Sequence, residues 1–103
     1  VDHNIAYSNR ARGFASNSGD NVKFIHNTSW NNGLYAFVLD SHTKAINNIG
    51  VGTIYKSSIA TNIIEENNSW QRSGSVAFIS TNSNSVDFLR PTINGGFEEI
   101  GAM

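Results

Sequence analysis

Arg10 and Arg12 are the first side chains along the chain whose type and spacing suggest chemistry. Residues two positions apart point to the same side of an extended strand. The two guanidinium groups could therefore hold the carboxylates of an acidic ligand together. The alternative is that both arginines are solvated at a corner of the fold. Tyr35 and Tyr55 are candidate partners, because a tyrosine presents a flat aromatic face on which a sugar ring can stack.

Among the histidines and carboxylates, Asp40 and His42 could form an acid–base pair, but no nucleophile motif accompanies them. The chain contains 3 histidines and no cysteine, and no histidine has the HExxH spacing of a zinc site. Glu65–Glu66 and Glu98–Glu99 are adjacent pairs, and adjacent side chains diverge on a strand, unlike the facing carboxylates of a glycosidase. The residues themselves therefore predict no metal site.

A repeat of about 20 residues must position these side chains. An Asn followed three residues later by a large apolar residue occurs four times, at intervals of 23, 21 and 19 residues. Short β-type runs and corners rich in Asn and Gly accompany it, and together they predict a solenoid. The leucine pattern of leucine-rich repeats is missing, so we expect an all-β, right-handed parallel β-helix. The four asparagines are Asn4, Asn27, Asn48 and Asn67.

We expect these asparagines to form an internal ladder. The chain contains 15 Asn, and buried amides need hydrogen-bond partners, which equivalent amides of neighbouring coils can supply. Asn47 and Asn68 become members of the ladder if the register is shifted by one residue. The large residues of the four units then share a row, either as a core stack or as a sugar-binding platform: Tyr7, Trp30, Val51 and Trp70.

The repeat predicts a single domain over 1–103. Its four coils span about 1–20, 21–44, 45–62 and 63–82, and the segment 83–103 is a C-terminal tail that could cap the last coil. Within the coils, Ile46 to Val51, Ile64 to Trp70 and Val76 to Ile79 are each predicted to be one strand.

Charge and composition exclude some partners. The formal net charge is −1 and no basic patch is visible, so we expect no nucleic acid partner. No run of 18 apolar residues is present, so we expect no membrane span. The high content of Asn, Ser, Thr and Gly, with few Lys and Glu, is typical of an extracellular bacterial protein.

Two segments, AYSNRARGFASNS and VKFIHNTSWNNGLYAF, share an order with one known family. A stretch of small residues and Asn precedes a basic residue and Gly-Phe, and a strand with Asn-x-Ser-aromatic and an Asn-Gly turn follow. In this order the chain resembles the polysaccharide lyase family 9 pectate lyases, which are right-handed parallel β-helices with an Asn ladder. The resemblance covers most of this chain but only the C-terminal part of a full-length lyase.

The resemblance implies calcium-dependent β-elimination of pectate. In such a reaction a base removes the proton α to the uronate carboxylate, which Ca²⁺ neutralises. The family's lysine base corresponds to Arg12, and other pectate lyase families have an arginine in a comparable place. An arginine stays protonated at neutral pH, however, and the family's Asp after Gly-Phe is Ala15. The sequence also shows no Asp cluster for Ca²⁺, which the family binds upstream.

Two functions remain open on these observations. The first is a polysaccharide-binding or degenerate pectate lyase-like module, a piece of a larger lyase, which binds an acidic polysaccharide through Arg10, Arg12, Tyr35 and Tyr55. The second is a structural protein whose short β-helices stack end to end, because open coils expose unpaired strand edges. The size of the protein in solution distinguishes the two.

Overall fold

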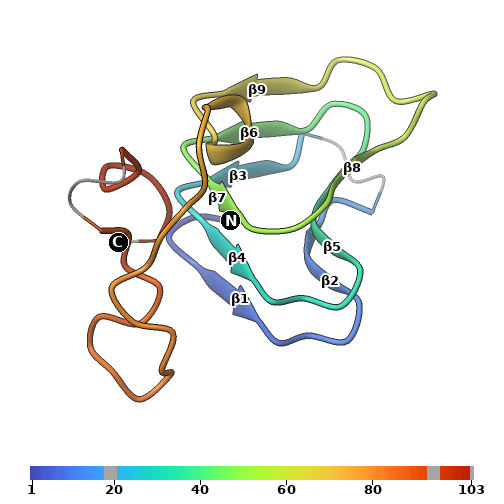
Figure 1. The fold of residues 1–103 in the computed structure, drawn as a ribbon. Helices are drawn as coiled ribbons and strands as arrows, with labels where there is room; N and C mark the ends of the chain where they lie inside the picture. The colour runs from blue at the N-terminus through green and yellow to red at the C-terminus, as the bar shows by residue number, and fades with distance from the viewer. Residues whose placement is uncertain (18–20, 93–95, 103) are drawn as a thin grey trace.

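The structure, a computed structural model, describes residues 1–17, 21–92 and 96–102. This part of the chain contains nine short β-strands and one 3₁₀ turn (Figure 1). The strands are β1 (Ile5–Tyr7), β2 (Arg12–Ala15), β3 (Lys23–Ile25), β4 (Thr28–Trp30), β5 (Tyr35–Leu39), β6 (Lys44–Ile46), β7 (Ile49–Gly50), β8 (Ile54–Lys56) and β9 (Ile64–Glu66), and the turn is η1 (Ser69–Gln71).

The strands form three parallel sheets of three strands each, in the orders β1-β4-β7, β2-β5-β8 and β3-β6-β9. Each strand pairs with one that lies about one repeat later, so that Ile5 is opposite Thr28 and Thr28 is opposite Ile49. Figure 1 shows the sheets as three stacks around a common interior. The all-β class predicted from the sequence is therefore confirmed, and the Asn interval is the interval that brings successive strands side by side.

Residues with a left-handed backbone make the corners between the strands. His3, His26, Asn47 and Asn67 all have φ between 53° and 58°. Asn and His are among the non-glycine residues that adopt this region most readily. An Asn follows each of them, and the last three of these next asparagines are fully buried. The sequence repeat is thus a repeat of corners, each of which turns the next Asn inward.

Aromatic side chains fill the space between the sheets. Phe37 is fully buried, and its ring stacks on Phe14 with centroids 5.1 Å apart. Trp70 lies on the other side of Phe37, also with centroids 5.1 Å apart. Trp70 therefore belongs to the interior, and the prediction that it shares a row with Tyr7 and Trp30 is wrong.

Three predicted strands differ from those in the structure. The segment 46–51 is divided between β6 and β7, because the left-handed corner at Asn47 separates them. The strand from Ile64 ends at Glu66, because Asn67 turns the chain in the same way and η1 follows. Val76 to Ile79 contains no strand; Phe78 makes only an isolated bridge to Pro91. The fourth predicted coil thus contributes β9 and η1 and no further strand among the described residues.

The described part of the C-terminal segment covers the β1-β4-β7 sheet, rather than capping the last coil as predicted. The backbone N–H of Gly101 donates to the Asn47 carbonyl over 2.8 Å, and that of Ala102 donates to Thr28 Oγ1 over 2.8 Å. In Figure 1 this segment, coloured orange to red, lies beside that sheet and away from β2, β5 and β8.

Apolar contacts fix the C-terminal segment to this sheet. Phe88 makes edge contacts with Tyr7 and Trp30, which are register partners on β1 and β4. Phe97 and Ile100 form a buried cluster with Ile49 of β7. The sheet face that carries Tyr7 and Trp30 therefore packs against the C-terminal segment.

Candidate functional site

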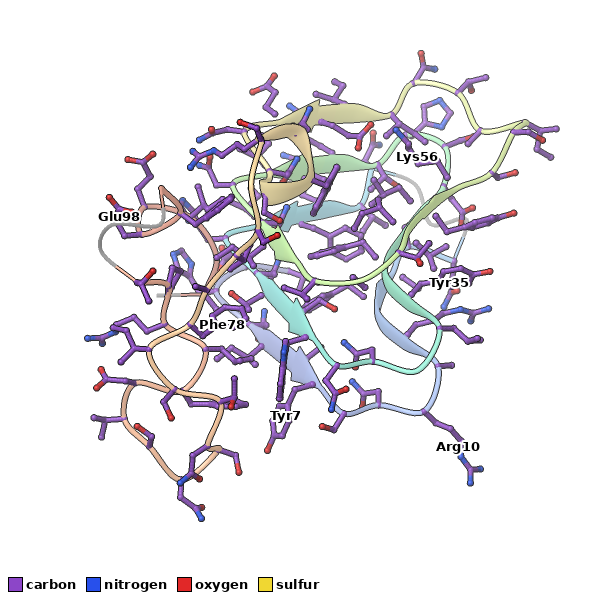
Figure 2. The ribbon with its side chains drawn as sticks, viewed as in Figure 1. Tyr7, Arg10, Tyr35, Lys56, Phe78 and Glu98 are labelled. Carbon is purple, nitrogen blue, oxygen red and sulfur yellow. The ribbon has the colours of Figure 1, made fainter. Side chains whose placement is uncertain are left out.

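Three of the four predicted ligand-binding residues lie on the β2-β5-β8 sheet. Arg12 is the register partner of Tyr35, and the Tyr35 and Tyr55 rings stack with centroids 5.1 Å and planes 23° apart. Arg12 is exposed and Tyr55 is 40% exposed. Figure 2 shows Tyr35 on the side of the molecule opposite Glu98 of the C-terminal segment. The face that carries these residues, Arg12, Tyr35 and Tyr55, is called the tyrosine face below.

Arg10 lies outside the strand, so the alternation assumed for Arg10 and Arg12 does not apply. β2 begins at Arg12, and the two residues before it form a bend. A Cβ on Gly33 would lie 1.9 Å from the Arg10 carbonyl oxygen. Only a glycine therefore fits where the chain passes this bend one repeat later. The Arg10 side chain itself extends from the corner into solvent (Figure 2).

The described residues do not form a calcium site beside Arg12. No three His, Asp or Glu side chains come together anywhere in the described part of the chain, whereas Ca²⁺ takes roughly six to eight oxygen ligands, several of them carboxylates. These residues therefore do not fit the calcium ion that the lyase resemblance implies, and no β-elimination step can be derived from their geometry. What Arg12 offers is a fixed positive charge with planar donors, which suits carboxylate binding.

A row of buried amides runs through the interior beside β4 and β7. Asn27 Oδ1 accepts the Asn4 N–H over 2.9 Å, and Asn48 Oδ1 accepts the Asn27 N–H over 2.8 Å. Asn68 Oδ1 in turn accepts the Asn48 N–H over 2.9 Å, and it accepts the Asn48 side-chain amide over the same distance. Each inner amide thus satisfies groups of the preceding coil that would otherwise be buried without partners.

The fourth member of this row is Asn68, so the prediction of Asn67 is wrong by one residue. Asn67 takes the left-handed corner position instead, where its side chain donates to Asn47 Oδ1 over 2.7 Å. Gln71 ends the row, because its Oε1 accepts both the Asn68 N–H, over 3.0 Å, and the Asn68 side-chain amide, over 2.9 Å.

The sequence reasoning missed two polar arrangements. Asn9 donates its N–H and its side-chain amide to Asn32 Oδ1 over 3.0 and 2.9 Å, which is a second amide pair at the same 23-residue interval. Glu65 holds Lys56 Nζ with one carboxylate oxygen and Trp70 Nε1 with the other, both over 2.8 Å. The interval could have revealed the first arrangement, whereas no sequence signal links Lys56, Glu65 and Trp70.

Comparisons with protein-family models, with curated proteins and with solved structures give no match for this chain. In the described residues, none of the helical structure is long and apolar enough to cross a membrane. The geometry of the tyrosine face is therefore the basis for an assignment of function.

Proposed function

We propose that the chain is part of a right-handed parallel β-helix that binds an acidic polysaccharide on its tyrosine face. Three parallel sheets joined by successive crossovers support the helical architecture, and the right hand is the rule for parallel crossovers. The stacked amides support it further, because they need coils in register. The resemblance to pectate lyases suggests the class of polymer, which is a chain of uronate sugars.

The observation that carries this proposal is the stacked pair Tyr35 and Tyr55 beside Arg12. The two facing ring surfaces of a stacked pair cover each other, and a sugar ring can stack on an outer ring surface of the pair. Arg12 adds a donor fork of the geometry that carboxylates accept. We propose binding rather than catalysis, because the described residues supply no calcium site.

Calorimetric titration with oligogalacturonate tests this function. Tyr35→Ala and Tyr55→Ala should each weaken binding about tenfold. Stacking of a nucleic-acid base on one aromatic ring is worth about 1–3 kcal/mol, and we expect a similar contribution from a sugar ring. Tyr35→Phe should bind almost as well as the native chain, since it keeps the ring. Leu34→Ala is the matched control, because Leu34 precedes Tyr35 and is 60% exposed.

The outcomes of this titration separate the explanations clearly. Loss of binding in both alanine variants, with the Leu34 control unchanged, would support the tyrosine face. Equal affinity of all the variants, or no heat with any acidic oligosaccharide, would overturn it.

A second candidate function is self-association through exposed strand edges. β1 and β2 are edge strands at one end of their sheets, and β8 and β9 are edge strands at the other end. Edge strands present backbone groups that can pair with another chain. Gln71 closes the amide row, but it does not alter the strand order of the sheets. We therefore expect association of this kind to stack copies head to tail.

A further inference from the structure

Lys23 and Lys44 stand directly opposite each other on β3 and β6. Like charges in directly opposite positions of a sheet repel each other and destabilise it. Neither lysine ammonium has an ion pair or a hydrogen bond among the described residues, in contrast to Lys56, which pairs with Glu65 over 2.8 Å. Nothing in the described structure therefore compensates for the repulsion, and an anion held between the two ammonium groups would.

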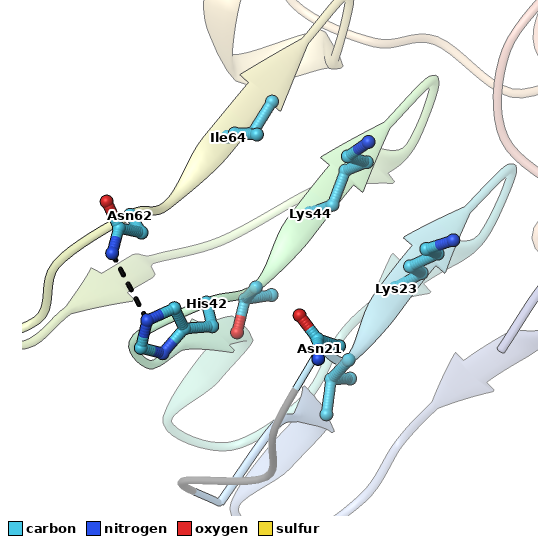
Figure 3. A pocket seen from close by; sticks show the side chains of 8 residues that line it. Asn21, Lys23, His42, Lys44, Asn62 and Ile64 are labelled. Carbon is cyan, nitrogen blue, oxygen red and sulfur yellow. Dashed lines mark hydrogen bonds between the residues drawn. The ribbon is translucent and has the colours of Figure 1, made fainter.

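The two lysines line a groove of about 280 Å³ on the β3-β6-β9 sheet. Figure 3 shows that Lys23, Lys44 and Ile64 project from equivalent places on the three strands, and that both lysine side chains extend in the same direction. Register pairing agrees, since Lys44 is opposite both Lys23 and Ile64. The groove thus has two adjacent cations and an apolar residue along one wall.

Polar groups form the other wall of the groove. Asn21, His42 and Asn62 occupy successive left-handed corners with φ of 55°, 63° and 59°. The Asn62 amide lies 3.1 Å from His42 Nε2 (Figure 3), so these two side chains hold each other in place. Amide and imidazole groups of this kind can bind the hydroxyl groups of a sugar.

Thr43 is a second and independent sign of a missing partner. It lines the same groove, it is only 1% exposed, and its Oγ1 has no hydrogen-bond partner among the described residues. Buried hydroxyl groups are almost always hydrogen-bonded. Because this oxygen is shielded from solvent, a water molecule bound between Thr43 and the groove would supply the partner that it lacks.

We propose that this groove is a binding site for a carboxylate of an acidic sugar chain, separate from the tyrosine face. The carboxylate would lie between the Lys23 and Lys44 ammonium groups, and the sugar would lie toward the wall of His42 and Asn62. Glu66, which stands two residues after Ile64 on β9 and therefore on the same side of the strand, would limit the groove to one carboxylate. The site does not require the tyrosine face to be functional.

Amide chemical shifts recorded during titration with trigalacturonate test the site. The amides of β3 and β6 should shift, and the double variant Lys23→Gln/Lys44→Gln should bind at this sheet at least tenfold more weakly. Arg10→Gln/Arg12→Gln is the matched control, because it also removes two cations from exposed positions. Circular dichroism checks that both variants are folded, which we expect because neither pair makes a side-chain hydrogen bond or ion pair among the described residues.

The results distinguish this inference from the proposed function. Loss of β3 and β6 shifts in the lysine variant alone supports the groove, whether or not the arginine variant still binds through β2 and β5. Retained affinity in the lysine variant, equal shifts with the methyl ester of trigalacturonate, or tighter binding of a single-stranded oligonucleotide would each overturn the inference. Loss of binding only in the arginine variant would leave the tyrosine face as the single site.

Discussion

At the scale of residues, one feature recurs: a left-handed corner residue followed by an inward Asn. His26 precedes Asn27, and Asn47 precedes Asn48. The corner residue ends one strand, and the Asn after it accepts hydrogen bonds from the coil before. Each buried Asn side chain therefore supplies hydrogen-bond partners to buried polar groups on its neighbours, which water cannot reach.

Asn48→Ala should lower the free energy of unfolding by about 3 kcal/mol. The substitution leaves the buried Asn27 N–H and the Phe24 carbonyl without the partners they have at 2.8 Å, and each unsatisfied buried group costs about 1–3 kcal/mol. Asn84→Ala is the control, because Asn84 is exposed and does not occupy a left-handed corner, and it should cost about 0.5 kcal/mol or less. Urea denaturation measures both values, and equal values would contradict the role of Asn48 in the buried amide row.

The sequence predicts most of this row but not all of it. Asn4, Asn27 and Asn48 are placed by the interval alone. The pair Asn67-Asn68 offers two amides, and alignment on the large residue three positions later selects the first. That alignment fails because Trp70 belongs to a 3₁₀ turn that faces the interior rather than to a strand.

At the scale of elements, η1 ends the stack of strands. Gln71 accepts from Asn68 and donates its Nε2 to the Glu65 carbonyl over 3.0 Å. The 3₁₀ turn thus brings a side chain of the same chain to the place where another coil would supply its Asn. The interval of the repeat could not predict this ending, because Gln71 interrupts the pattern instead of continuing it.

Gln71→Ala should destabilise the chain by about 1–2 kcal/mol, because the Asn68 N–H and side-chain amide both lose their acceptor. Gln71→Glu is the informative comparison. It keeps an acceptor oxygen, but its second carboxylate oxygen would face the Glu65 carbonyl oxygen and could donate to it only when protonated. The Glu variant should therefore gain stability relative to the Ala variant as the pH falls toward about 4. Thermal unfolding followed by circular dichroism at two pH values measures this difference, and a difference that does not change with pH would contradict the hydrogen-bonding role of Gln71.

The C-terminal segment depends on a close approach at Gly101. Gly101 has φ of 83°, and a Cβ there would lie 2.6 Å from both Ile49 Cδ1 and Thr28 Oγ1. Sequence reasoning could not place this segment, because Phe97 and Ile100 are separated by two glutamates and show no periodicity.

Gly101→Ala should therefore cost about 2–4 kcal/mol, the sum of backbone strain and overpacking. Gly74→Ala is a matched control, because Gly74 also has a positive φ, of 93°, but no atom within 4 Å of the added Cβ. It should cost only about 1 kcal/mol. Hydrogen exchange at the amides of Gly101 and Ala102 locates the effect, and unchanged protection there would contradict the docking of the segment on β4 and β7.

At the scale of the whole molecule, the three sheets have different roles. The β1-β4-β7 sheet is covered by the C-terminal segment, the β2-β5-β8 sheet carries the tyrosine face, and the β3-β6-β9 sheet carries the two unpaired lysines. The chain extends 38 × 26 × 21 Å. A linear polymer can therefore meet either free sheet along the direction in which the strands are stacked.

The central claim is that the chain binds an acidic polysaccharide, and size-exclusion chromatography with light scattering tests it most directly. The protein would be run alone and with polygalacturonate. We expect a species near 11.2 kDa when the protein is run alone. When polygalacturonate is added, we expect the protein to elute together with the polymer. A larger assembly whose size is indifferent to the polymer would contradict the claim and would favour association through the exposed strand edges.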